Sequence, residues 1–151
     1  MSRQQRQSVT PRPWCLRKRV LPQHTDHAGV MWHGAYVAWL EEARVEALAA
    51  AGVDYAELSG QGLELMVVRL ELQYRRALKH GERVALRSWL GPEEGVRIPF
   101  HTALYGGDGG LAAEACVTLA LVDRERGRLK RQMPAELADA FARLRRGPMT
   151  R

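Results

Sequence analysis

The sequence predicts an α+β fold in which a curved antiparallel sheet wraps one long central helix, with a short helix at the C-terminal end. Two observations predict it. Apolar residues recur every three to four positions over residues 35–51, as on the buried face of a helix. Beyond this segment the period changes to two in four or five consecutive segments joined by short turns, which is typical of antiparallel strands. A single long helix facing such strands is expected to be covered by a sheet that curves around it.

The long helix is expected over residues 35–51, a segment rich in alanine, leucine and glutamate. Gly52 follows directly, at the position where glycine commonly ends a helix. A second, amphipathic helix is expected over residues 134–146, with Pro134 near its first position. The face of the long helix that is expected to be buried contains small alanines, which let a sheet approach closely, and two larger residues: Tyr36, Leu40, Ala43, Ala47 and Ala50.

The clearest strand pattern lies in residues 66–74, where every even position is apolar and Arg69, Glu71 and Gln73 alternate with them. The even positions are therefore expected to face the core. Residues 111–122 are small and apolar throughout, which indicates a central strand. The strands expected along the chain are residues 14–21, 66–74, 82–90, 96–105, 111–122 and 128–133.

The 151 residues are enough for one domain, which is expected over residues 14–146, between a disordered basic leader (1–13) and a tail (147–151). The net charge of +6 arises at the ends, because residues 1–19 hold six basic side chains and no acid. Four more arginines lie in residues 143–151, so the body of the chain is acidic. Without a nucleic-acid-binding motif, this distribution does not indicate nucleic-acid binding.

Several other protein classes are excluded by the sequence. No run of 18 apolar residues is present, so no membrane span is expected. No secretory signal is found, and Cys15 and Cys116 are too few for a disulfide framework, so the expected location is cytoplasmic. Neither of the glycine-rich motifs of dinucleotide-binding and P-loop proteins occurs.

Chemistry-bearing residues gather in the loop before the long helix, where residues 23–36 hold three of the five histidines and the first acid. The first N–H groups of a helix have no partner within it and can stabilise an oxyanion. The N–H groups of His33 and Gly34 are the candidate donors. Asp26 is the candidate carboxylate, able to attack a carbonyl or to activate water. Asp26 could also be a turn or cap residue, and His33 an ordinary helix-start histidine.

Residues 25–36, which read TDHAGVMWHGAY, resemble the signature of hotdog-fold acyl-CoA thioesterases of the 4-hydroxybenzoyl-CoA thioesterase class. Residues 39–44 resemble the start of that family's central helix, and residues 74–82 and 111–127 match two further segments. The likeness covers roughly residues 15–138, in register. The resemblance implies a hotdog fold and an enzyme that hydrolyses acyl-CoA without a metal or organic cofactor.

The resemblance also implies roles for individual residues. Asp26 would be the catalytic carboxylate, and the helix end at His33 would hold the thioester carbonyl, with the His33 side chain also serving the site. Trp32, Tyr36 and Gly29 would line the substrate pocket. The substrate would be a small aromatic or short acyl-CoA, with 1,4-dihydroxy-2-naphthoyl-CoA as one specific candidate. The site would lie at the subunit interface of a homodimer or homotetramer.

The chain departs from the family pattern in ways that bear on coenzyme A binding. His24 stands where many relatives carry aspartate, and Ala77 replaces a common proline. The basic cluster that binds the 3′-phosphate in some relatives is mostly acidic here. The remaining candidates for the phosphates are Arg75, Arg76, Lys79 and Arg97.

Four alternatives to this interpretation stay open. Glu42 or Glu46 could be the catalytic carboxylate, as another hotdog lineage places a glutamate on the central helix. His24 and His27 could bind a metal together with Asp26 and His33. The same fold also supports enoyl-thioester hydratases, which normally have four residues between Asp and His where this chain has six. The chain could instead bind acyl-CoA without hydrolysing it.

Overall fold

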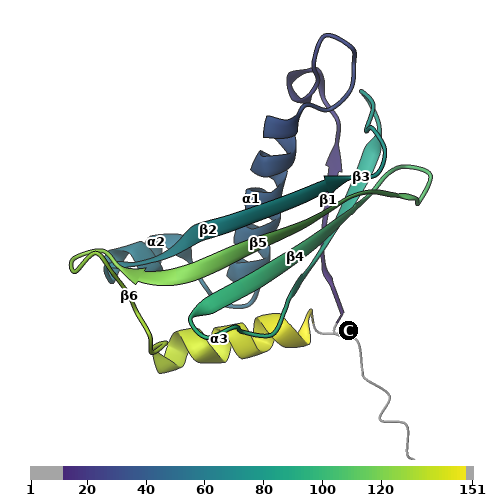
Figure 1. The fold of residues 1–151 in the computed structure, drawn as a ribbon. Coiled ribbons are helices and arrows are strands. Elements are labelled where there is room, and N and C mark those ends of the chain that lie inside the picture. Colours follow the sequence, from purple (N-terminus) through teal and green to yellow (C-terminus); the bar gives the residue numbers. More distant parts are fainter. Residues whose placement is uncertain (1–11, 149–151) are drawn as a thin grey trace, which may run out of the picture.

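A computed structural model describes residues 12–148, so residues 1–11 and 149–151, most of the expected leader and tail, lie outside the described residues. Figure 1 shows a strongly twisted sheet with α1 across one face and α3 near one end. In chain order the elements are β1 (Trp14–Arg19), the 3₁₀ turn η1 (Pro22–His24), α1 (His33–Ala50), α2 (Tyr55–Gly60), β2 (Leu63–Tyr74), β3 (Arg83–Leu90), β4 (Arg97–Tyr105), β5 (Leu111–Asp123), β6 (Arg128–Leu129) and α3 (Ala135–Arg146).

All neighbouring strands are antiparallel, in the order β1-β3-β4-β5-β2, and β6 pairs with β5. As expected, β5 lies inside the sheet, between β4 and β2. The strands β1 and β2 are therefore the two long edges. The core lies between α1 and the inner face of the sheet, where Ala43 and Ala47 on α1 are buried against it. The α+β prediction of a long helix wrapped by a curved antiparallel sheet is confirmed.

Strand β2 corrects the expected alternation of residues 66–74. A bulge between Val67 and Arg69 shifts the register against β5 by one residue. Residues directly opposite each other in antiparallel strands point to the same face. Before the bulge Leu65 lies opposite buried Leu121, whereas after it Leu70 lies opposite buried Val117. Uninterrupted alternation predicted that Met66 shares one face of the sheet with Leu70, Leu72 and Tyr74. Because of the bulge, Met66 instead points to the opposite face.

Several boundaries also differ from the sequence expectation. α1 begins two residues earlier than expected, at His33, and β2 begins at Leu63. α2 was not expected; it is one short turn started by Asp54, whose Oδ1 accepts the Ala56 N–H at 2.7 Å. β6 covers only Arg128–Leu129, because the chain then turns away toward α3. Among the described residues, no helix is long and apolar enough to cross a membrane.

Candidate active site

The loop from η1 to α1 is built around a tight turn at Asp26–Val30. The Asp26 N–H donates to the Val30 carbonyl at 2.9 Å, and the Gly29 N–H donates to the Asp26 carbonyl at 3.1 Å. Gly29 has a φ of 77°, in the left-handed region that favours glycine. Gly29 thus serves the turn itself, and the structure shows no role beyond this for the residue expected to line the pocket.

The Asp26 side chain is exposed, and its two oxygens have different environments. Oδ1 accepts the Ala28 N–H at 2.9 Å and the Val30 N–H at 3.3 Å, so it caps the turn. Oδ2 has no hydrogen-bond partner among residues 12–148. The turn-cap role and the catalytic role are therefore compatible, because capping fixes the carboxylate and leaves one oxygen open.

The turn is held against the connection between β2 and β3. The Met31 N–H donates to the Leu78 carbonyl at 2.8 Å, and the His80 N–H donates to the Gly29 carbonyl at 3.0 Å. Val30 forms a bridge with Lys79, and Thr25 forms one with Met31. These backbone contacts fix the turn that carries Asp26 next to the start of α1.

The N-terminus of α1 is not capped by a side chain. Trp32 is the N-cap residue, and its carbonyl accepts the Ala35 N–H at 3.0 Å. The N–H groups of His33 and Gly34 have no acceptor among the residues that the structure describes. The first turn also contains no acidic residue, so the positive end of the helix dipole stays uncompensated. This end of α1 can hold a developing negative charge on a ligand oxygen.

Trp32 lies over the first turn of α1. Its indole packs so closely on Gly34 that a Cβ at position 34 would overlap the ring, with Cη2 as the nearest atom. The same ring meets His33 edge to face, with centroids 5.2 Å apart. Trp32 is 44 % exposed and His33 is also exposed, so both aromatic side chains face solvent beside the unpaired N–H groups.

Tyr36 lies deeper than expected for a pocket residue. It is 2 % exposed and packs edge to face against Tyr74 of β2, with ring centroids 5.0 Å apart. Burial, with the nearby Tyr74 hydroxyl, raises the pKa of Tyr36. Tyr74 is 53 % exposed and covers it, so Tyr36 supports this surface from the core. Tyr74 was not among the predicted site residues. Its position at the end of the alternating segment of residues 66–74 is the sequence feature that could have indicated a place beside the site.

Of the expected phosphate ligands, Arg76 is already engaged. Its guanidinium contacts Glu82 at 2.8 Å and Asp108 at 2.7 Å. The hydrogen bond from Arg76 lowers the pKa of Glu82, and the Gly110 N–H together with Arg76 lowers that of Asp108. Arg75 lies beside it and contacts Glu114 at 3.2 Å. Arg76 therefore links the start of β3 to the turn between β4 and β5, and Arg75 links the end of β2 to β5.

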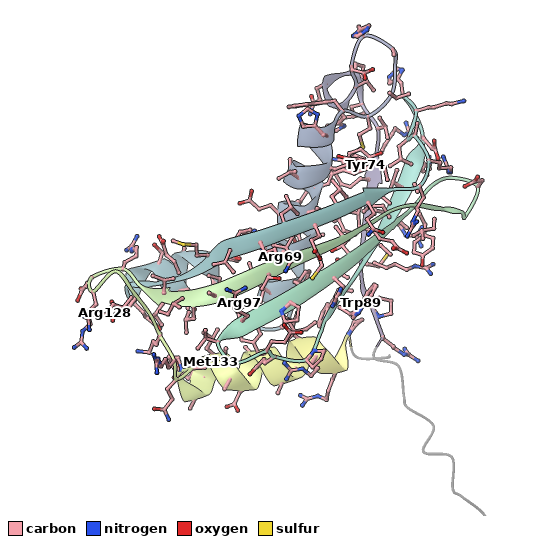
Figure 2. The ribbon with its side chains drawn as sticks, in the orientation of Figure 1. Arg69, Tyr74, Trp89, Arg97, Arg128 and Met133 are labelled. Carbon is pink, nitrogen blue, oxygen red and sulfur yellow. The ribbon has the colours of Figure 1, made fainter. Side chains whose placement is uncertain are left out.

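Lys79 and Arg97 lie at opposite ends of the sheet. Lys79 is exposed beside the Asp26 turn, and its ammonium has no ion-pair partner among residues 12–148. Arg97 is the first residue of β4, whose other end, at Tyr105, lies on the side of the turn. With about 3.3 Å per residue, Arg97 is roughly 26 Å from that end. Figure 2 shows Tyr74 near the turn and Arg97 well away from it. One chain alone does not bring Arg97 to the site.

The alternative carboxylates and the metal hypothesis receive no geometric support. Glu42 pairs with Lys18 at 3.0 Å and lies nine residues beyond His33, about 14 Å along α1. Glu46 lies one turn further. In the described part of the chain no group of three or more His, Cys, Asp or Glu side chains is arranged to hold a metal ion. The structure thus brings together Asp26 and the start of α1, but not a four-residue metal site.

The chain is similar to several known proteins in sequence and in fold. The chain is 36 % identical over 146 residues to a putative esterase of Synechocystis sp., covering 94 % of this chain and 86 % of that protein. It is 26 % identical over 101 residues to the putative acyl-CoA thioesterase YneP of Bacillus subtilis, covering 67 % and 73 %. A DHNA-CoA thioesterase from Staphylococcus aureus has the same fold, with a TM-score of 0.80 at 22 % identity over 86 % of this chain and 89 % of that one.

The family match spans residues 20–141, which include the loop between β1 and α1, the long helix and every strand of the sheet except β1. The hotdog fold and the class of enzyme expected from the sequence, a thioester hydrolase, are thereby confirmed. The chain belongs to the thioesterase-like superfamily.

Proposed function

We propose that this protein hydrolyses acyl-CoA thioesters that carry a small aromatic or short acyl group, at a site formed by Asp26 and the start of α1. The observation that supports it best is the pairing of two features. A fixed carboxylate has one unpartnered oxygen, and the adjacent helix end offers two N–H groups without acceptors among residues 12–148. Thioester hydrolysis needs both a nucleophile or base and oxyanion donors.

In the proposed reaction the thioester carbonyl oxygen accepts hydrogen bonds from the N–H groups of His33 and Gly34. Asp26 either attacks the carbonyl carbon, forming an anhydride that water hydrolyses, or takes a proton from the water that attacks. In both routes the C–S bond breaks, coenzyme A leaves as the thiolate and the acyl group leaves as the carboxylate. The His33 imidazole, at the same helix end, would contact the reacting groups.

The proposed acyl class rests on Trp32. A large, half-exposed indole beside the oxyanion donors provides a flat apolar surface for an aromatic or short acyl group. Two similar proteins, the putative acyl-CoA thioesterase YneP and the DHNA-CoA thioesterase of Staphylococcus aureus, support a coenzyme A thioester as the substrate. The 1,4-dihydroxy-2-naphthoyl thioester is therefore the most specific candidate.

The two edges of the sheet support a homo-oligomer. On β1 the edge carries Arg17, Lys18 and Arg19, and such charges discourage strand pairing. On β2 the edge exposes a row of apolar side chains, each 41–53 % accessible: Met66, Val67, Val68, Leu70 and Tyr74. A long apolar edge is a template for pairing with another chain. The proposed occupant of the β2 edge is the β2 edge of a second copy.

Antiparallel pairing of two β2 strands would also complete the coenzyme A site. It places the Leu63 end of one strand beside the Tyr74 end of the other. The partner's Arg97, near the Leu63 end of its own sheet, would then approach Lys79 and the Asp26 turn of this chain. The dimer is the minimal proposed unit, and two dimers would form the tetramer that the resemblance implies. A cytoplasmic location is also proposed, since the free thiols of Cys15 and Cys116 are typical of reducing compartments.

The proposed function is tested by colorimetric release of free thiol across aryl-, short- and long-chain acyl-CoAs. The highest kcat/KM is expected for an aryl or short acyl group, because Trp32 offers a surface of that size. Failure to release thiol from any member of the panel contradicts the proposed activity. Loss of the enoyl absorbance of crotonyl-CoA without thiol release would instead indicate a hydratase.

A lysine at Val68 is expected to dissociate the oligomer into folded monomers, because a charge on the β2 edge opposes strand pairing. Val68 is already 43 % exposed, so the monomer should keep its fold. Light scattering after size-exclusion chromatography measures the mass, and circular dichroism checks the fold. Leu129→Lys is the matched control, since Leu129 is 52 % exposed on β6, away from the β2 edge. An unchanged mass for Val68→Lys contradicts this interface.

A further inference from the structure

His24 is the residue that closes the loop carrying Asp26, through three separate hydrogen bonds. Its N–H donates to the Leu21 carbonyl at 2.9 Å, and its ring Nδ1 accepts the Leu21 N–H at 3.0 Å. Its carbonyl accepts the N–H of Trp32, the N-cap residue of α1, at 3.1 Å. Leu21 stands just before the loop and Trp32 at its end. His24 therefore ties both ends of the segment that holds the proposed carboxylate.

The ring of His24 is fixed from a second side by α1. It meets the buried Trp39 edge to face, with centroids 5.1 Å apart. Trp39 lies further along the helix that begins with the unpaired N–H groups of His33 and Gly34. The imidazole of His24 therefore contacts both the loop that carries Asp26 and the helix α1. A shift of that ring would move the carboxylate and the oxyanion donors relative to each other.

The bond from the Leu21 N–H requires a lone pair on Nδ1. A neutral imidazole has one nitrogen that accepts and one that donates, whereas a protonated imidazole has two donors and no acceptor. With Nδ1 accepting, the proton must be on Nε2, which lies 3.5 Å from Nε2 of the Gln23 amide; that amide accepts the proton when its oxygen is turned toward the ring. A proton on Nδ1 would instead point at the Leu21 N–H, so the observed bond selects the tautomer with its proton on Nε2.

The charged groups near this ring come from three elements. Lys18 of β1 lies with its Nζ 5.9 Å from the Trp39 ring centroid, and Glu42 of α1 holds that ammonium at 3.0 Å. Asp26 lies two residues further along the loop. None of these carboxylates forms an ion pair with His24 in the described part of the chain, so the ring is held by its hydrogen bonds and by its contact with Trp39.

We propose that His24, as the neutral tautomer with its proton on Nε2, is a positioning residue that sets the Asp26 turn against the start of α1. The changes in kcat expected below rest on the proposed function, whereas the tautomer assigned to His24 does not. It assigns to His24 a role separate from chemistry, since its ring nitrogens bond within the loop rather than toward a substrate.

Two conservative variants separate this role from a merely structural one. In His24→Asn the amide oxygen can take the place of Nδ1 as an acceptor for the Leu21 N–H. In His24→Gln the oxygen corresponds to Nε2 and is too far along the side chain for the Leu21 N–H. His24→Asn is expected to keep the kcat of the wild type at pH 8. His24→Gln is expected to lose about 10- to 100-fold in kcat with a smaller change in KM, as displaced catalytic groups do.

His27→Asn is the control, because His27 is an exposed histidine of the same loop and has no hydrogen bond to its side chain among residues 12–148. Its kcat should match that of the wild type. Equal kcat for His24→Asn and His24→Gln would overturn the proposal.

An activity-independent measurement separates failure of this inference from failure of the proposed function. Long-range ¹H–¹⁵N spectra of the labelled protein report which imidazole nitrogen carries the proton. The expected result at pH 8 is a protonated Nε2 and a bare Nδ1 at His24. A proton on Nδ1 overturns the inference even if the enzyme hydrolyses thioesters, and the expected tautomer stands even if no substrate in the panel is hydrolysed.

Discussion

Asp26→Asn is expected to lower kcat for thioester hydrolysis by about 10²- to 10⁴-fold, the usual contribution of a positioned acid–base group. Asparagine keeps the Oδ1 acceptor that caps the turn at Ala28 and Val30, so the loop should stay in place. What is lost is the charge on the free oxygen, which either attacks the thioester or takes a proton from water. Thiol release on the preferred acyl-CoA measures the loss, and KM should change less than kcat.

Asp123→Asn is the matched control for that experiment. Asp123 caps the hairpin after β5 in the same manner, with Oδ1 accepting the N–H groups of Glu125 at 3.1 Å and Arg126 at 3.3 Å. This hairpin lies at the end of β5 away from the Asp26 turn of its own chain, and Asp123 is not among the groups proposed to touch substrate in either copy, so Asp123→Asn should leave kcat unchanged. Full activity in Asp26→Asn would remove Asp26 from the chemistry and return Glu42, Glu46 and the histidines to consideration.

Gly34→Ala is expected to reduce kcat/KM by about 10²-fold, because the added methyl group cannot coexist with the present position of Trp32. Its Cβ would overlap the indole ring, well inside van der Waals contact. Either the indole leaves the first turn of α1 or the helix start moves, and both change the surface beside the oxyanion donors. A displacement of about 1 Å at such a site costs about this much in rate. Steady-state kinetics on the preferred thioester measures the effect.

A double variant decides whether Trp32 transmits the effect. In a Trp32→Ala background the methyl group added at position 34 meets no ring, so Trp32→Ala/Gly34→Ala should be no slower than Trp32→Ala alone. Gly60→Ala is the control for glycine replacement in a helix, since a Cβ at Gly60 contacts nothing within 4 Å. Additive losses in the double variant would show that the glycine matters for the helix start and not for the tryptophan above it.

Apart from the short helix α2, the order of the helices and strands could be predicted from the sequence, because the hydrophobic period is a local property. The helix over residues 35–51 and the strands after it follow from spacing alone, and the observed bounds differ by a few residues. The bulge at Val67–Arg69 could not be predicted in this way. A run such as MVVRL contains apolar residues at both odd and even positions, so its phase is decided by pairing with β5 and not by the run itself.

The candidate site was predictable where it depends on a contiguous segment. Asp26, His33 and Gly34 lie within nine residues of each other, and the family resemblance fixes their register. Contacts between distant segments were not predictable. Arg76 carries the charge expected of a phosphate ligand, but only the fold shows that Glu82 and Asp108 already bind it. The hydrogen bond between the Leu21 N–H and the His24 ring likewise depends on loop geometry, which no spacing rule encodes.

The unlike edges of the sheet have a consequence for how far assembly can proceed. If both edge strands of a sheet could pair with another copy of the chain, copies would add without limit and form a filament. Here the β2 edge is apolar, whereas the β1 edge presents Arg17 and Arg19 beside Arg83 of β3, so two β1 edges repel each other. In the proposed dimer, pairing through β2 would occupy the apolar edge of both copies. Edge-to-edge growth would therefore close after one step, with a two-fold axis and a rim of positive charge at each end.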